Sequence, residues 1–423
     1  MIRSTFKRPW LFAGVLTLTA AGAVTAQNPV IDWNNIAITT ALAASQATAP
    51  GSNSQVGSFV YLAYVHLAMY DAVNAIDHRF QSYGSHLSAP ADASKDGAAI
   101  AAAYYTLTRY FPDQAATLLT QYNAALAAIP DGSAKADGIA IGQAAANSII
   151  GIRTGDGRGA SVPYTWPGVP TPGIWIPTPP AFAAPALPWL SQMVPFTMNS
   201  PSQFRPEPPP ALTSTEWADD YNRTKTLGAI NSTVRTPEQT EIGLFWTDHS
   251  GKQYARAFRA LATAQGLDVS DSARLFATLY TTVADAGIGC WDGKLFYSFW
   301  RPITAIRNGS IDGNANTVAD PAWTPLGVTP NHPEYPAAHG CVTGSVASAL
   351  KNFFGTPHVT LVVTSAVTGT THTFTSTKDL ETEVENARIY VGFHYHHSVV
   401  QGGVLGMKVA NEVSRNYFLP LNQ

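Results

Sequence analysis

The sequence predicts an all-α protein, a large helical bundle, and three observations support this fold class. Apolar and alanine-rich runs with helical spacing recur on both sides of a proline-rich centre. Only residues 358–375 have the Thr/Val-rich composition typical of strands, so we expect at most a short β-hairpin. Hydrophobic residues make up 45% of the 423 positions, enough apolar volume for a large core.

The first residues have the pattern of a secretory signal peptide. Three basic residues precede an apolar run over 10–23, and Ala26 ends a small-residue cleavage site. The apolar run is roughly 14 residues long, short of the ~20 that a membrane span requires. We therefore expect 1–26 to be a signal peptide, and the mature chain, 27–423, to be a single domain that is secreted or periplasmic and not bound to a membrane.

The N-terminal part of that domain, 27–154, consists of predicted helices. The second of them is apolar on every face, which is typical of a helix buried inside a large helical protein. The predicted helices span 32–50, 55–77, 93–110, 113–128 and 134–153.

The middle segment, 155–213, is rich in proline. Half of the chain's 30 prolines lie between Pro163 and Pro210, and proline excludes helix because it lacks a donor and clashes with the preceding turn. Proline-rich runs are often disordered linkers. Tryptophan and phenylalanine recur through this one, however, and such side chains seek burial. We therefore expect a long ordered excursion that wraps across the helices.

The C-terminal part, 214–423, returns to helical patterns and contains the candidate active site. Gly392 should interrupt the last helical stretch, and Ser376 with Asp379 resembles a capping box. Helices are predicted at 215–227, 236–247, 252–265 and 269–301, then a loop at 307–335, a helix opened by Pro336, the hairpin, a helix after Ser376, and a helix at about 399–415.

Composition narrows the class of protein further. The formal net charge is −3, and this near-neutral balance argues against nucleic acid, which needs a basic face. The two cysteines, Cys290 and Cys341, each flank a candidate active-site segment. They form either a disulfide, which export permits, or two small buried apolar side chains.

Two cations lie in an aromatic-rich stretch that reads Lys294-x6-Arg301-Pro302. A spacing of seven is nearly two helical turns, so both side chains should leave the same helix face. Exposed cations at this spacing are ordinarily a solvated stripe. Among so many aromatic side chains, burial with a counter-anion is the better interpretation.

Two further segments supply histidines. One of them reads Pro336-Ala-Ala-His339 and should start a helix. The first backbone N–H groups of that helix, including that of Ala338, should be free to bind an anion. Arg388 and His394 are six apart, and the Gly392 break would let both face one site. The histidines that follow, at 396 and 397, allow a divalent metal cluster as a less favoured alternative. Three cations suit a tetrahedral oxyanion, and the histidines suit proton transfer and covalent or coordinate bonding.

Together, the segments resemble the signature of the superfamily of vanadium-dependent haloperoxidases and type 2 phosphatidic acid phosphatases: K-x6-R-P, P-S-G-H and S-R-x5-H-x3-D. The surrounding residues are similar to the secreted bacterial haloperoxidases, and the likeness covers nearly all of the mature chain. The motif is specific as a set and weak piece by piece.

The resemblance implies an exported haloperoxidase that uses vanadate and hydrogen peroxide to oxidise a halide, which then halogenates an organic acceptor. His394 would be the axial metal ligand, or the nucleophile of a phosphatase, and His339 the general acid/base. The vanadate oxygens would be held by Lys294, Arg301, Ala338 and Arg388, and Lys294 would also polarise the peroxide. Self-association into a homo-oligomer is left open.

The resemblance also implies a halide pocket. Trp291 lies three residues before the lysine, and His332 lies seven before the acid/base histidine. Histidine at the second position is similar to the brominating subgroup, whereas phenylalanine is typical of the chlorinating one. Bromide is therefore the expected halide.

Two residues depart from the family pattern. Ala337 replaces the serine of the second motif, which removes a hydroxyl donor worth about 1–3 kcal/mol to a charged partner. Ser398 replaces the aspartate of the third, which orients the histidine in phosphatases. The second loss counts more against a phosphatase than against a vanadate site, where a hydroxyl or carbonyl would hold the imidazole. An acid phosphatase and a non-catalytic oxyanion-binding protein remain the alternatives.

Overall fold

The computed structural model describes residues 28–421. The predicted signal peptide lies outside the described residues. Within them the fold is all-α, as predicted, with thirteen α-helices and one two-stranded sheet. The helices are α1 (Pro29–Ala43), α2 (Gly57–Asp77), α3 (Lys95–Tyr110), α4 (Ala115–Ala127), α5 (Ser133–Ile152), α6 (Thr215–Gly228), α7 (Pro237–Phe245), α8 (Ser250–Ala264), α9 (Val269–Tyr297), α10 (Pro302–Arg307), α11 (Ala338–Phe354), α12 (Thr377–Tyr390) and α13 (His396–Asn416).

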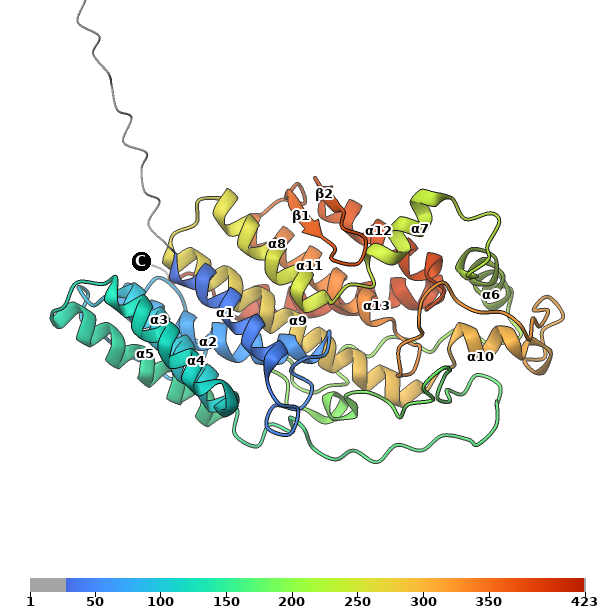
Figure 1. The fold of residues 1–423 in the computed structure, drawn as a ribbon, viewed down its shortest axis with the longest axis horizontal. Helices are drawn as coiled ribbons and strands as arrows, with labels where there is room; N and C mark the ends of the chain where they lie inside the picture. The colour runs from blue at the N-terminus through green and yellow to red at the C-terminus, as the bar shows by residue number, and fades with distance from the viewer. Residues whose placement is uncertain (1–27, 422–423) are drawn as a thin grey trace, which may run out of the picture.

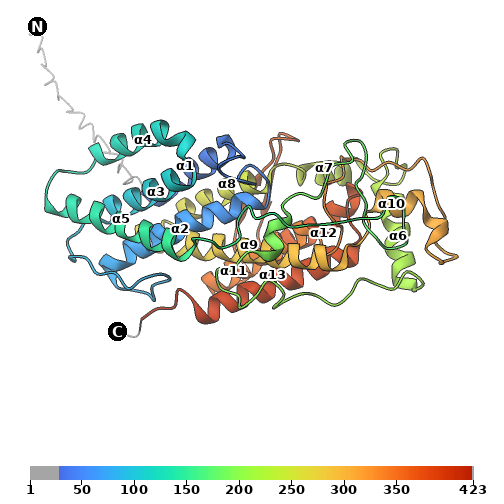
Figure 2. The same ribbon diagram turned by 90° about the horizontal axis from the view of Figure 1, so that it is seen from below.

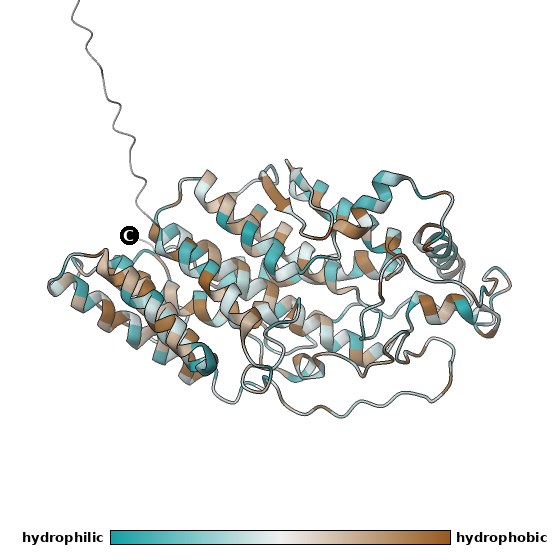
Figure 3. Ribbon diagram, in the orientation of Figure 1, coloured by the Kyte–Doolittle hydropathy of each residue, from teal (hydrophilic) through white to brown (hydrophobic). Residues whose placement is uncertain are grey.

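Helix α9 is the central element of the bundle. It runs along the middle of an elongated molecule, with α3, α4 and α5 at one end and α6, α7 and α10 at the other (Figure 1). α2, α11 and α13 pack against it, and the turned view shows α11 and α13 side by side (Figure 2). Apolar and polar residues alternate along most of the outer helices, as expected for helices with one buried face (Figure 3).

Helix α2 is buried on all sides, as its composition predicts. In the described part of the chain it is the one helix long and apolar enough to cross a membrane, but all of its apolar window lies inside the protein. Its apolar surface is therefore accounted for by the core.

The proline-rich segment is an ordered excursion along one side of the bundle (the green trace at the lower edge of Figure 1). It contains no α-helix, only a short 3-10 helix at Pro188–Gln192. The Asp285 carboxylate of α9 accepts hydrogen bonds from the backbone N–H groups of residues 196, 197 and 198. Trp175 and Trp189 are buried, whereas Phe182 is 64% exposed. Only some of the aromatic side chains are therefore buried as expected.

Several boundaries differ from the sequence-based prediction. α1 ends at Ala43, seven residues early, because a series of turns follows. α9 ends at Tyr297, where Ser298 adopts a left-handed backbone with φ 49°. The hairpin is present as β1 (Leu361–Thr364) paired antiparallel with β2 (Thr371–Phe374). The Ser376 side chain caps α12, and Gly392, with φ 78°, separates α12 from α13.

Candidate active site

Six of the predicted site residues line one cavity of about 440 Å³. They come from the C-terminal half of α9, the loop before α11, the start of α11, the end of α12 and the connection to α13. The cavity walls otherwise combine apolar side chains with a few polar groups, including Gln55 and Ser250. The six residues are Trp291, His332, Ala338, His339, Arg388 and His394.

Lys294 lies behind this cavity, fully buried on α9. Its ammonium donates three hydrogen bonds to the loop before α11, to the carbonyl oxygens of Pro333 at 2.8 Å, Glu334 at 3.0 Å and Pro336 at 2.6 Å. Burial, together with the neighbouring Arg301, lowers the pKa of Lys294 to about 8. The lysine thus fixes the loop that precedes His339 and adds positive potential to the site.

Arg301 is also fully buried, but it does not share a helix with Lys294. The prediction that one helix face presents both was wrong, because α9 ends before residue 301 and Pro302 starts the new helix α10. Arg301 Nη1 lies 2.9 Å from the Phe393 carbonyl oxygen and 3.1 Å from His394 Nε2. Burial lowers its pKa to about 10, so the guanidinium is charged at neutral pH.

Arg388 reaches the cavity from the last turn of α12. Its Nη1 donates to the Trp246 carbonyl oxygen at 2.8 Å, while its Nε is buried without a protein partner. Burial lowers its pKa to about 9, and Arg301 acts in the same direction. A buried guanidinium with an unused donor is what an anion site requires.

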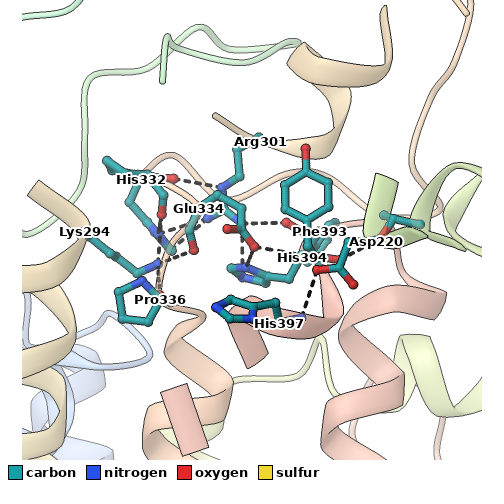
Figure 4. A network of polar contacts seen from close by, with 12 residues as sticks. Asp220, Lys294, Arg301, His332, Glu334, Pro336, Phe393, His394 and His397 are labelled. Atoms are coloured by element: carbon teal, nitrogen blue, oxygen red, sulfur yellow. Dashed lines mark hydrogen bonds and ion pairs between the residues drawn. The ribbon is translucent and has the colours of Figure 1, made fainter. Parts of the chain in front are cut away.

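His394 is held at both ring nitrogens (Figure 4). Its Nδ1 lies 2.8 Å from Glu334 Oε1, and its Nε2 lies 3.1 Å from Arg301 Nη1. Sequence reasoning missed Glu334 because it sought the histidine's carboxylate only at position 398. The available signal was a lone carboxylate between Pro333 and Pro336, next to a cation-rich motif.

Glu334 is fully buried. Burial raises its pKa to about 7, against the opposing effects of Arg301 and Lys294. Its Oε1 also accepts a hydrogen bond from the Tyr395 backbone N–H at 3.1 Å. The carboxylate therefore ties the loop before α11 to the residues just after His394.

His339 lies in the first turn of α11 and faces the cavity. Its Nε2 is 3.5 Å from the Ser250 hydroxyl, which itself donates to Gln55 at 3.1 Å. Burial and the charge of Arg388 lower the pKa of His339 well below the usual range. The imidazole is therefore neutral in the anion-free site.

The two predicted halide-pocket residues lie against each other. The ring centroids of Trp291 and His332 are 5.0 Å apart, and the Trp291 indole N–H donates to the Ala186 carbonyl oxygen at 2.8 Å. His332 Nδ1 lies 3.0 Å from Arg301 Nη2. Burial, Lys294 and Arg301 lower the pKa of His332 well below its usual range, so this ring is also neutral.

The alternative of a histidine metal cluster gains no support. His397 Nδ1 lies 2.8 Å from Glu216, away from the cavity, and its backbone N–H donates to Asp220 at 3.0 Å. Across residues 28–421 no group of three His, Cys, Asp or Glu side chains is placed to hold a metal ion. Cys290 and Cys341 are buried and free, which agrees with the second interpretation of this pair.

The site carries excess positive charge. Among the salt bridges of the described residues, none includes Lys294, Arg301 or Arg388. Glu334 is the carboxylate bonded directly to His394, and two of the buried cations, Arg301 and Lys294, act on its charge. An oxyanion in the cavity would balance this charge and use the free donor of Arg388.

Comparisons with known proteins agree with this geometry. Residues 274–422, about a third of the chain, match a family model described as the VCPO second helical-bundle domain. The part of the chain that holds the site is thus similar to the second helical bundle of the vanadium haloperoxidases, and the resemblance carried by the three motifs is confirmed.

The individual proteins that are similar to this chain are named as vanadium-dependent peroxidases of different halides. Vanadium chloroperoxidase from Curvularia inaequalis is 28% identical over 210 residues, and the match covers 40% of this chain but only 34% of that protein. A bacterial vanadium-dependent iodoperoxidase structure superposes with a TM-score of 0.75 at 22% identity, covering 92% of this chain and 97% of the other. An apo bacterial vanadium-dependent chloroperoxidase gives 0.69 at 15% identity, covering 86% and 93%. At these identities the two structures are similar in fold.

Proposed function

We propose that the protein is a vanadate-dependent haloperoxidase. The overall reaction joins a halide, hydrogen peroxide and one proton to give hypohalous acid and water, and the acid then halogenates an organic acceptor. The observation that carries the proposal is the arrangement of Lys294, Arg301 and Arg388, buried without salt-bridge partners, around the His394–Glu334 pair.

The residues present fit vanadate. His394 Nε2 would be the ligand, because its Nδ1 is engaged by Glu334. Arg388, Arg301 and the backbone N–H groups of Ala338 and His339 would hold the anion's oxygens. Lys294, whose three donors bind the carbonyl oxygens of the loop before α11, would contribute its charge from behind the cavity. Bound vanadate would supply a Lewis-acidic centre that activates hydrogen peroxide without changing its own oxidation state.

The protein supplies proton transfer and electrostatic stabilisation. His339 is neutral in the anion-free site, so its Nε2 can accept a proton from incoming hydrogen peroxide and return one to the water that leaves. Lys294 stabilises negative charge that develops on the peroxide oxygens. Lys294 is fully buried, and the electrostatic effect of a charge is larger when it is shielded from bulk water.

Bromide is the proposed halide. Trp291 and His332 together form a neutral, polarisable wall of the cavity. Relatives of this fold include proteins named for iodide and for chloride, so the halide has to be measured. With saturating peroxide we expect turnover of iodide and bromide and little turnover of chloride.

Bromination of a phenolic dye by purified apoprotein, with and without orthovanadate, tests the proposal. Activity should appear only with orthovanadate and should be lost in His394→Ala. A His394→Ala variant that still gains vanadate-dependent activity would overturn the ligand assignment.

An acid phosphatase that forms a phosphorylated His394 is the second candidate, and Glu334 favours it more than the sequence did. The Glu334 carboxylate, 2.8 Å from Nδ1, can support positive charge on the imidazole. The absence of an aspartate at position 398 had suggested that no such support was present. A phosphatase would hydrolyse a phosphomonoester without vanadate and would be inhibited by it. A non-catalytic oxyanion-binding protein would bind phosphate and show neither activity.

We also propose that the chain is exported and cleaved near Ala26. The basic start, the apolar run and the small-residue site support this proposal. Mass spectrometry of protein recovered from outside the cytoplasm would test it, with a mature N-terminus close to residue 27 as the expected result.

A further inference from the structure

A second, much smaller cavity lies beside His394. It has a volume of about 10 Å³, roughly the space of one water molecule. Its walls bring together residues that are far apart in the sequence, from the loop before α11, the start of α13 and α6. They include Glu334, Tyr395, Ser398, Trp217 and Asp220.

Several polar atoms around this cavity are buried and have no partner among the described residues. They are Glu334 Oε2, the Tyr395 hydroxyl, His397 Nε2 and the Ser398 hydroxyl. Four such atoms at one small cavity are unusual, because buried polar groups nearly always find a hydrogen-bond partner. The Ser398 hydroxyl is close enough to lower the pKa of Glu334. Positions 334 and 398 therefore face the same space.

The contacts of His394 determine the form of its ring. Arg301 can only donate hydrogen bonds, so Nε2, at 3.1 Å from Arg301 Nη1, must be the acceptor. A neutral ring then carries its proton on Nδ1 and donates it to Glu334 at 2.8 Å. In this form the Nε2 lone pair is free for an electrophile once an anion takes up the Arg301 donor.

We propose that Glu334, in the loop before α11, is the positioning residue for His394. It has the role that a carboxylate at position 398, in α13, would otherwise have. This inference deepens the proposed function but rests on it only for the identity of the anion. The two positions line one cavity, so one carboxylate suffices and the residue at 398 is free to be serine.

An aspartate at 398 should be tolerated if space is made for it. Position 398 lies in the first turn of α13, which has no acidic residue there. Negative charge in a first turn interacts favourably with the helix dipole. Shortening residue 334 to alanine leaves the volume that the new carboxylate needs.

Three variants test the proposal: Glu334→Gln, Glu334→Ala, and Glu334→Ala combined with Ser398→Asp. In Glu334→Gln, which is isosteric, we expect orthovanadate to bind the apoprotein at least about tenfold more weakly, as is typical when a ligand histidine loses its partner. Glu334→Ala should lose as much or more. The double variant should recover most of the loss. Equilibrium dialysis measures this binding without any turnover.

The second readout is the imidazole N–H proton of His394 in the anion-free protein, by NMR of histidine-labelled samples. A hydrogen bond to a carboxylate moves such a proton far downfield. We expect that signal in the wild type and the double variant and its upfield shift in both single variants. Glu216→Gln is the control, because it removes a carboxylate–histidine contact of the same length, 2.8 Å, at His397 and leaves the contact of His394 in place.

The outcomes separate clearly. Unchanged orthovanadate affinity and an unchanged His394 signal in Glu334→Gln would overturn the role of Glu334. If the double variant binds orthovanadate as weakly as Glu334→Ala, a carboxylate at position 398 does not replace the one at position 334, and that part of the proposal is wrong. Circular dichroism and thermal melting establish that each variant is folded, and if Glu334→Ala does not fold, Glu334→Gln alone decides the first point. Failure of the proposed function would appear differently, as orthovanadate binding and His394 effects without dye bromination.

Discussion

At the scale of single residues, the site is defined by charge that the protein leaves unbalanced. Burying a cation is costly unless a partner compensates, and here Lys294, Arg301 and Arg388 have only carbonyl and imidazole partners. Sequence spacing predicted these three cations and both histidines. It did not predict Glu334, because a carboxylate that acts across 60 residues has no fixed spacing from its histidine.

The lowered pKa of Lys294 gives a pH-dependent prediction. Below pH 8 the lysine is charged in both folded and unfolded protein, and the folded state bears the cost of burying that charge. Between about 8 and the ordinary value of 10.5, only the folded protein has released its proton, so this cost disappears as the pH rises. An anion bound in the cavity interacts more favourably with the charged lysine than with the neutral one.

Sulfate, a tetrahedral dianion throughout this range, should therefore raise the melting temperature more at pH 7 than at pH 9.5. Differential scanning calorimetry with and without sulfate measures the effect. In Lys294→Gln the sulfate effect should be smaller and should vary less between the two pH values. An equal effect of sulfate at both pH values in the wild type would contradict the assignment.

At the scale of elements, the ends of helices decide where the functional groups lie. Ser298 and Pro302 break the predicted long helix, so Arg301 approaches His394 from a loop. Gly392 separates Arg388 from His394, as the sequence indicated. Helix interiors followed from residue composition, whereas the break at Ser298 depends on a left-handed backbone that serine rarely adopts and that no local pattern signals.

The start of α11 offers a test at this scale. Ala337 is the N-cap residue and provides no side-chain hydrogen bond. Ala337→Ser should stabilise the protein by about 1 kcal/mol, because serine can accept a free backbone N–H of the first turn. Chemical unfolding measures the change. Ala338→Ser, one position inside the helix, is the control, and a gain there as large as at 337 would contradict capping.

Asp285 offers a second test, because it fastens the proline-rich excursion to α9. Its loss would leave three backbone N–H groups without their acceptor, so Asp285→Ala should cost about 3–5 kcal/mol in the free energy of unfolding. Urea denaturation followed by tryptophan fluorescence would measure this cost. Asp285→Asn, which keeps one acceptor oxygen, should lose less. A neutral Asp285→Ala substitution would show that the excursion is held by other contacts.

At the scale of the whole molecule, α9 serves both halves of the fold. α2 packs against it, and so do α11 and α13, which frame the site. Residues 214–423 contain every predicted site residue, yet alone they would expose the face of α9 that α2 covers. The single-domain interpretation therefore predicts that the halves depend on each other.

Expression of residues 214–423 without the rest should give insoluble or molten protein, whereas the chain from 27 should unfold in one cooperative transition. Proteolytic nicking near Val169, which is 67% exposed, should leave both pieces together on size exclusion. A soluble C-terminal piece that binds orthovanadate as tightly as the whole chain would refute the single domain.

The sequence by itself determined the fold class, the ordered proline-rich excursion and the segments that meet at the site, because composition, helical periodicity and motif spacing are local properties of the chain. Only the tertiary structure decided that Lys294 and Arg301 leave different elements, that Glu334 engages His394, and that positions 334 and 398 share one cavity. Those facts depend on how distant segments approach one another, and the free energy of that approach comes from the whole core.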